Sequence, residues 1–185
     1  MPTPPATSTP EPAAGSLWLF DTPRLRVRRI EAGDGGAMLA VYGDADAMRW
    51  VGDGRPLVPE QCEEWIGVTL RNYATRGYGM VAIVERTSDE VIGFCGLVHP
   101  GGQPDAEIKY ALRRDRWGHG YATEAASALL AWGAATFGLR EVIATTAPEN
   151  TASHHVLLKA GMRRGELRHN GDGSRTQLFV WAATD

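Results

Sequence analysis

Two glycines stand directly before a long alanine-rich run in the stretch WGHGYATEAASALLAWG, residues 117–133. Alanine is the strongest helix former, whereas glycine removes the Cβ and lets another group approach the backbone closely. A helix N-terminus carries unpaired N–H groups and the positive end of the helix dipole, and both attract anions. The stretch therefore predicts a helix that begins beside a bound anion.

The rest of the chain predicts alternating strands and helices. We expect the order β-α-α-β-β-β-α-β-α-β-β, an α/β fold with a mixed sheet. Pro59 and Asn150 suit helix starts, Gly77 and Gly161 suit helix ends, and NGDG suits a hairpin turn. The expected strands are 25–30, 79–85, 91–99, 106–113, 142–147 and the two arms of a hairpin over 163–182; the expected helices begin at Asp34, Pro59, Gly118 and Asn150.

The bulk properties describe an ordinary globular domain. The chain has 185 residues and a net charge of −3, which argues against a general affinity for nucleic acid or an anionic membrane. Its two cysteines, Cys62 and Cys95, have no metal-ligand or redox spacing, which is typical of a reduced, cytoplasmic protein. The first 16 residues contain five prolines and predict a disordered tail, followed by one domain over 17–185.

A Gly-x-Gly at a helix start has several explanations. A nucleotide P-loop requires Lys-Ser/Thr after its last glycine, and this sequence has none there. A dinucleotide-binding fold requires a third glycine where Thr123 stands. A tight turn without any ligand is the simplest alternative.

Four segments, taken together, resemble the Gcn5-related N-acetyltransferase superfamily, and within it the branch of the ribosomal-protein alanine acetyltransferases. They are DTPRLRVRRIEAGD, AEIKYAL, WGHGYATEAASALL and ENTASHHVLLKAGM. The resemblance covers roughly residues 20–183 and implies a splayed mixed sheet flanked by helices. The sequence departs from the family pattern at Trp117, where Gln or Arg is usual, at His119, where Lys is common, and at Leu157, where many relatives have a Tyr.

The resemblance implies that acetyl-coenzyme A (acetyl-CoA) binds as co-substrate, without a metal. Its pyrophosphate would lie on the amides of 118–123, and its pantetheine arm along the backbone of 110–112 like an added strand. Arg113, Arg114 and Arg116 would add positive charge, although a solvated strand end explains them equally well. The expected cofactor-binding residues are Tyr110, Ala111, Leu112, Arg113, Trp117, Gly118, His119, Gly120, Tyr121, Ala122, Thr123 and Asn150.

The same resemblance gives two catalytic candidates. Glu107 stands where relatives have a base that removes a proton from the amine; a surface strand residue or an ion-pair partner is the alternative. Ser153 would hydrogen-bond the departing thiolate, although it also suits a helix start. Neither cysteine suggests a nucleophile, so transfer would be direct. His154 and His155 are adjacent and cannot share a helix face as metal ligands.

The implied function is acetyl transfer to a primary amine: a protein N-terminus, a polyamine, an amino acid or a drug. A non-catalytic acyl-CoA-binding regulatory module is the alternative from another class. A homodimer is compatible with the sequence. The six tryptophans are expected to lie mostly in the core.

Overall fold

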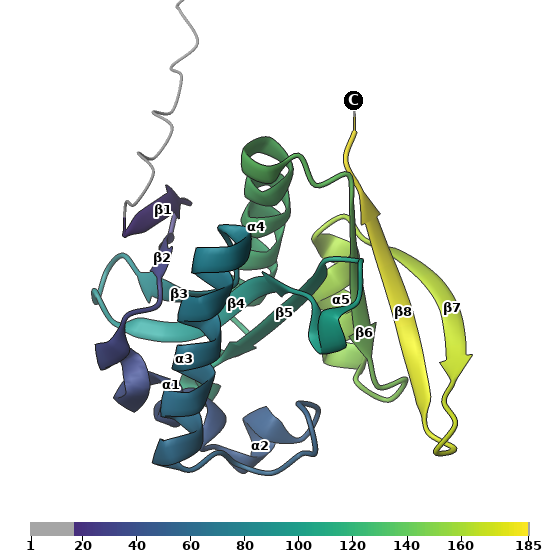
Figure 1. Cartoon of the computed structure of the whole chain (residues 1–185), viewed down its shortest axis with the longest axis horizontal. Helices are drawn as coiled ribbons and strands as arrows, with labels where there is room; N and C mark the ends of the chain where they lie inside the picture. Colours follow the sequence, from purple (N-terminus) through teal and green to yellow (C-terminus); the bar gives the residue numbers. More distant parts are fainter. Residues whose placement is uncertain (1–16, 185) are drawn as a thin grey trace, which may run out of the picture.

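The computed structural model describes residues 17–184, so the predicted disordered tail lies outside the described residues. Eight strands form one mixed sheet in the order β1-β2-β3-β4-β5-β6-β8-β7. The α/β class and the mixed sheet are confirmed (Figure 1). The strands are β1 (Trp18–Asp21), β2 (Leu25–Arg29), β3 (Met80–Glu85), β4 (Val91–Val98), β5 (Glu107–Leu112), β6 (Glu141–Thr146), β7 (Arg163–His169) and β8 (Arg175–Ala182). The α-helices are α1 (Gly35–Tyr42), α2 (Ala45–Met48), α3 (Pro59–Arg76), α4 (Tyr121–Phe137) and α5 (Thr151–Lys159).

Two short elements are absent from the predicted order. Strand β1 is four residues long and pairs antiparallel with β2; a segment this short has no periodicity to detect. Helix α2 is a single turn whose start is held by Asp44, which accepts hydrogen bonds from the amides of Asp46 and Ala47. A third difference concerns the strand expected over 142–147, which begins at Glu141, opposite Ala182.

Helices α3 and α5 begin and end close to the predicted residues. Pro59 is the first residue of α3, and Gly77 ends it with a left-handed φ of 83°. Asn150 caps α5 by accepting a hydrogen bond from the amide of Ser153 at 3.2 Å. No helix within residues 17–184 has both the length and the apolar character required to cross a membrane.

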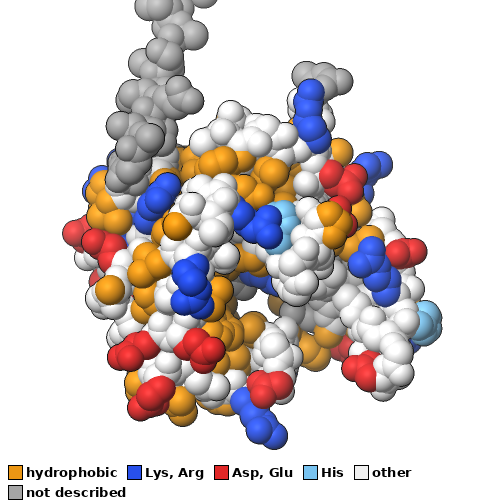
Figure 2. All heavy atoms as spheres, in the orientation of Figure 1, with side chains coloured by type: hydrophobic (Ala, Val, Ile, Leu, Met, Phe, Trp, Pro, Cys, Tyr) orange, Lys and Arg blue, Asp and Glu red, His pale blue; other side chains and the backbone are white. Residues whose placement is uncertain are grey.

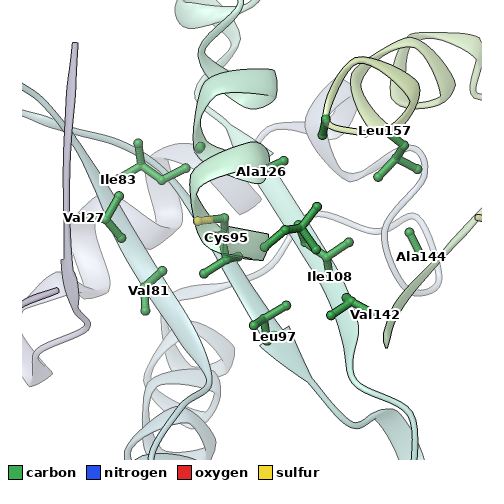
Figure 3. Packing of buried hydrophobic residues seen from close by; sticks show 14 of the residues in the cluster. Val27, Val81, Ile83, Cys95, Leu97, Ile108, Ala126, Val142, Ala144 and Leu157 are labelled. Atoms are coloured by element: carbon green, nitrogen blue, oxygen red, sulfur yellow. The ribbon is translucent and has the colours of Figure 1, made fainter. Parts of the chain in front are cut away.

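The helices cover the two faces of the sheet in separate groups (Figure 1). On one face, α4 and α5 pack on the strands: Ala126, Leu129 and Leu157 join the cluster that contains Ile83, Cys95, Leu97, Ile108 and Val142, as Figure 3 shows in part. On the other face, α1 and α3 pack against Ala82, Phe94 and Ala111 through Met38, Val41, Tyr42, Cys62 and Ile66. The sheet therefore separates two apolar layers.

The sheet opens between its two central strands. Within residues 17–184, the parallel pair β5 and β6 is in register only at Glu107 and Ile143, with one further backbone bond from Ile143 to the carbonyl of Ala106. Beyond this point the two strands separate. The splay that the resemblance implied is present, and it leaves one side of β5 without a strand partner.

Candidate active site

A cavity of about 840 Å³ runs through the opening between β5 and β6. One half is lined by α4, α5 and β6, and the other by α1, α3 and the loop after α2. The space-filling view shows the molecule hollowed at this place, with hydrophobic side chains along the wall nearest α1 and α3 (Figure 2). A ligand can therefore reach β5 from both faces of the sheet.

The loop before α4 has the geometry of an anion site. Gly118 and Gly120 have φ values of 77° and 80°, in a region where side chains other than glycine are strained. A Cβ on Gly118 would meet open space. The helix begins at Tyr121, with Gly120 as its N-cap and no side chain bonded to its first amides. The first turn therefore starts at Tyr121, not at Gly118 as the sequence suggested, because both glycines are left-handed.

The exposed side of β5 can accept an extended ligand. The amide of Arg113 donates to the carbonyl of Ile92, toward β4. Because backbone groups alternate along an antiparallel strand, those of Tyr110 and Leu112 point the other way, into the opening. The indole of Trp117 donates to the carbonyl of Leu112 at 2.8 Å and so ties the glycine loop to the end of the strand. Tyr110, Ala111, Leu112 and Trp117 all line the cavity.

The three arginines after β5 are already paired with carboxylates. Arg113 binds Asp115 and Glu90, and these ion pairs raise the pKa of its guanidinium, with Asp115 the larger cause. Arg114 binds Asp44 and Asp46, whereas Arg116 lies against Glu85, Glu90 and Asp115. Of these three, Arg116 lines the cavity. The side chains of Arg113 and His119 are not among its lining residues.

A cation that the sequence analysis missed lies at the glycine loop. Arg24 donates to the carbonyl of His119 at 2.8 Å, stacks 4.4 Å from the ring centre of Tyr121, and pairs with Glu124 at 2.7 Å. A Cβ on Gly120 would lie 3.5 Å from its guanidinium. Arg24 reaches this place from the start of β2, about a hundred residues away in sequence, and no local pattern reveals such a contact.

Glu107 is buried, with 3% of its surface exposed, so it is not a surface-facing strand residue. Its carboxylate is held by the ammonium of Lys109 and the hydroxyl of Thr145, and by the amide of Gln103 at 3.3 Å. Lys109 and Thr145 line the cavity, whereas Glu107 does not. Lys109 and Thr145 therefore lie between the carboxylate and the cavity and connect the two by hydrogen bonds.

Ser153 and Asn150 lie on the opposite side of the opening, at the start of α5. The Oγ of Ser153 is 2.6 Å from the hydroxyl of Tyr110, a contact that the sequence could not reveal. Burial raises the pKa of Tyr110 to about 12, although the hydrogen bond from Ser153 opposes this. Leu157, where many relatives have a Tyr, is buried in the core. Tyr110 is thus the hydroxyl-bearing aromatic residue beside Ser153.

The prediction that the tryptophans lie mostly in the core is wrong. Trp50, Trp65 and Trp117 are exposed, and all three line the cavity. Trp132 and Trp181 are partly buried against the core. A sequence cannot separate a core tryptophan from one that forms a binding wall, since both carry the same apolar surface.

The described part of the chain has neither a cluster of metal ligands nor a cysteine suited to act as a nucleophile. No group of three or more His, Cys, Asp or Glu side chains there could hold a metal ion. Cys62 and Cys95 are buried free thiols, and burial raises the pKa of Cys95 to about 12. A thiol with such a pKa stays protonated and is a poor nucleophile. The cavity instead brings together a helix start without a side-chain cap, an open strand edge and a hydroxyl pair, with a buried carboxylate behind Lys109 and Thr145.

The comparison with known proteins agrees with this arrangement. The family model described as "Acetyltransferase (GNAT) domain" matches residues 24–163. YnaD of Bacillus subtilis (strain 168), named as an N-acetyltransferase, is 29% identical over 143 residues, which are 77% of this chain and 81% of that protein. A GNAT acetyltransferase structure from Bacillus anthracis has a TM-score of 0.75 at 24% identity, covering 88% of this chain and 96% of that one.

The ribosomal-protein branch is also among the similar structures. RimL, a ribosomal L7/L12 α-N-protein acetyltransferase in complex with coenzyme A, has a TM-score of 0.74 at 18% identity, covering 87% of this chain and 95% of that one. At this identity the likeness concerns the fold. The family match, the shared fold and the site geometry lead to one conclusion: the chain belongs to the GNAT family and is an N-acetyltransferase.

Proposed function

We propose that the chain binds acetyl-CoA in the opening between β5 and β6 and transfers its acetyl group directly to a primary amine. The observation that carries the proposal is the combination of an uncapped α4 start with an unpaired β5 edge on one cavity. GNAT acetyltransferases use acetyl-CoA, and the similar RimL structure holds coenzyme A. Bound acetyl-CoA supplies an activated thioester.

The residues of the loop fit the pyrophosphate. The amides at the start of α4 are free of side-chain caps, and Gly118 leaves open space where a ligand would approach. The helix dipole and the free amides would supply the positive potential at this point, since Arg24, Arg113 and Arg114 are each paired with a carboxylate. The backbone of Tyr110 and Leu112 would hold the pantetheine arm, and Asn150 and Trp117 line the same cavity.

Two sets of side chains would serve the transfer. An ammonium group has a pKa near 10 and must lose a proton before its nitrogen can attack. We assign this proton to Glu107, which it would reach through the hydroxyl of Thr145, through Lys109 or through water, because the carboxylate does not itself line the cavity. The hydroxyls of Ser153 and Tyr110 would hydrogen-bond the departing thiolate.

A binding test and an activity test together examine the proposal. Acetyl-CoA should raise the melting temperature, because a ligand that binds the native state stabilises it, and NAD or ATP should do clearly less. Thiol release should then depend on an added amine. Stabilisation by NAD equal to that by acetyl-CoA would contradict the proposed cofactor.

Homodimer formation and a cytoplasmic setting stay predictions. The two free, buried cysteines suit a cytoplasmic setting.

A further inference from the structure

The half of the cavity that faces α1 and α3 has walls built from large apolar side chains. Trp50 and Trp65 are 46% and 37% exposed and line it together with Tyr42 and Met38. The rings of Tyr42 and Trp65 meet edge-on with their centres 5.3 Å apart. Tyr42 also stacks on Phe94 at 6.0 Å, so one wall is a continuous row of aromatic rings. We call this half of the cavity the aromatic chamber.

Within the described part of the chain, the aromatic chamber has no free carboxylate to bind a polycation. Among the described residues that line the whole cavity, Asp46 is the one carboxylate. It already pairs with Arg49 at 3.2 Å and with Arg114 at 2.9 Å. The other nearby carboxylate, Glu107, is paired with Lys109. A second or third ammonium group of a polyamine would therefore find no free negative partner and would lose hydration.

Two hydroxyls that face the aromatic chamber form no hydrogen bond to another described protein group. Tyr42 and Thr69 are each 4% exposed, and both line the cavity. Within residues 17–184, neither hydroxyl forms a hydrogen bond to another group of the protein. Burial raises the pKa of Tyr42, so its hydroxyl stays protonated. Neither oxygen is among the fully buried unpaired atoms of the described residues, and both side chains line the cavity, so the two hydroxyls are accessible to a ligand there.

We propose that the amine acceptor is a small primary amine with an aromatic ring that carries a hydrogen-bonding substituent. The ring would pack on Trp50, Trp65 and Tyr42, and the substituent would bond the hydroxyl of Thr69 or Tyr42. The amine end would point through the opening toward Lys109 and Thr145. This inference rests on the proposed function. It excludes polyamines as the preferred acceptor.

The reaction at this site balances without a further reactant. The ammonium group first loses one proton to Glu107 or solvent; its nitrogen then forms a bond to the acetyl carbon and releases a second proton, and the carbon–sulfur bond of the thioester breaks. The electron pair of that bond goes to sulfur, which takes up a proton, so the products are the N-acetyl amine and the free thiol. The aromatic chamber contributes only the position of the amine.

The test measures binding and turnover with four amines: tyramine, phenethylamine, putrescine and spermidine. Calorimetric titration in the presence of coenzyme A gives the affinity of each amine without catalysis, and thiol release from acetyl-CoA gives kcat/KM. We expect tyramine to exceed phenethylamine about tenfold, as one hydrogen bond allows, and both to exceed the two polyamines. Equal or tighter binding of a polyamine would overturn the proposal.

Matched variants assign the effect to named residues. Trp65→Ala should weaken tyramine binding about tenfold or more, whereas Trp18→Ala, on the β1 edge and outside the cavity, should not. Thr69→Val keeps the shape of the side chain and should reduce the preference for tyramine over phenethylamine, while Thr75→Val on the same helix should keep it. Losses of equal size in target and control variants would contradict the aromatic chamber.

The outcomes separate this inference from the proposed function. If acetyl-CoA fails to stabilise the protein, the assigned cofactor is wrong. If tyramine binds by calorimetry and Trp65→Ala abolishes its binding, the chamber is correct even where no thiol is released. If thiol release is rapid with polyamines and absent with aromatic amines, the N-acetyltransferase reaction stands and the inference about its acceptor is wrong.

Discussion

The hydroxyl of Tyr110 lies 2.6 Å from the Oγ of Ser153, across the opening between β5 and the start of α5. The two residues come from different layers, and the function we propose puts the departing thiolate beside their hydrogen bond. Burial raises the pKa of Tyr110 to about 12, with Ser153 opposing the rise. Tyr110 therefore stays protonated at neutral pH, and the two hydroxyls can act as one donor unit.

Ser153→Ala and Tyr110→Phe should each lower kcat, because each removes a donor to the developing thiolate. Loss of one donor in a dry site costs about 10²–10³ in rate, and we expect the lower end because water can enter this cavity. The double variant should be little slower than the worse single variant, since the hydroxyls act together. Steady-state thiol-release kinetics measure all three.

The affinity for acetyl-CoA is the control for this pair. It should change little in either single variant, because neither hydroxyl is assigned to the pyrophosphate or the pantetheine. Weaker binding with an unchanged kcat would instead place Ser153 in cofactor binding or in the start of α5.

Gly120→Glu should abolish the rise in melting temperature that acetyl-CoA causes. The substitution puts a side chain and a negative charge beside the uncapped helix start. Gly173→Glu is the matched control: that glycine has a similar φ of 84° and open space around it, but it lies in the β7–β8 hairpin. If acetyl-CoA still raises the melting temperature of a folded Gly120→Glu protein, the glycine loop does not bind the cofactor and is only a turn.

Glu107→Gln should lower kcat/KM by about 10²–10⁴, as expected when a positioned base is lost. The amide keeps the size of the side chain but cannot collect the proton of the amine. Higher pH deprotonates more of the free amine, so kcat/KM of the variant should rise more steeply with pH than that of the wild type. Kinetics between pH 6 and 9.5, a range of about 3.5 units set by the amine pKa, provide the comparison.

The ion pair with Lys109 makes a stability control necessary for this variant. Glu149→Gln, which removes an exposed carboxylate paired with Arg175, is the matched substitution. A Glu107→Gln enzyme with the wild-type rate and pH profile, at an unchanged melting temperature, would show that the proton leaves by another route.

His154 should make the protein less stable as the pH falls below its ordinary pKa of about 6.5. Burial lowers the pKa of His154 in the folded protein, and the ring bonds Thr146 at 2.8 Å and Arg164 at 3.3 Å. The unfolded chain binds a proton that the folded chain does not, so stability is present above the unfolded pKa and is lost on acidification.

Denaturant unfolding between pH 5 and 8, a span of about 3 units around that pKa, measures the effect. His154→Gln should flatten the slope of the free energy of unfolding against pH, although it lowers stability overall. His169→Gln, at an exposed position of β7, should keep the wild-type slope. Identical slopes in all three proteins would rule out His154 as the titrating group.

The sequence was sufficient for features with local causes. Pro59, Gly77 and Asn150 act on their own helix ends, so α3 and α5 could be located closely. The glycine pair before α4 was also found, but its positive φ values move the helix start from the predicted Gly118 to Tyr121. Short elements without periodicity, β1 and α2, could not be found in the same way.

Features that depend on contacts across the fold could not be predicted. Arg24 reaches the glycine loop, Tyr110 reaches Ser153, and Lys109 and Thr145 enclose Glu107 only because the sheet brings distant segments together. The same holds for the tryptophans: whether Trp50 and Trp65 enter a core or line a cavity depends on which surface the sheet leaves open.

Thiol release from acetyl-CoA in the presence of a broad panel of primary amines tests the central claim most directly. The account predicts release that requires both the protein and an amine, with one N-acetyl amine formed for each thiol, and its loss in the Gly120→Glu protein. Acetyl-CoA that stabilises the wild-type protein while no amine in the panel releases thiol would contradict this account and favour a non-catalytic acyl-CoA-binding module.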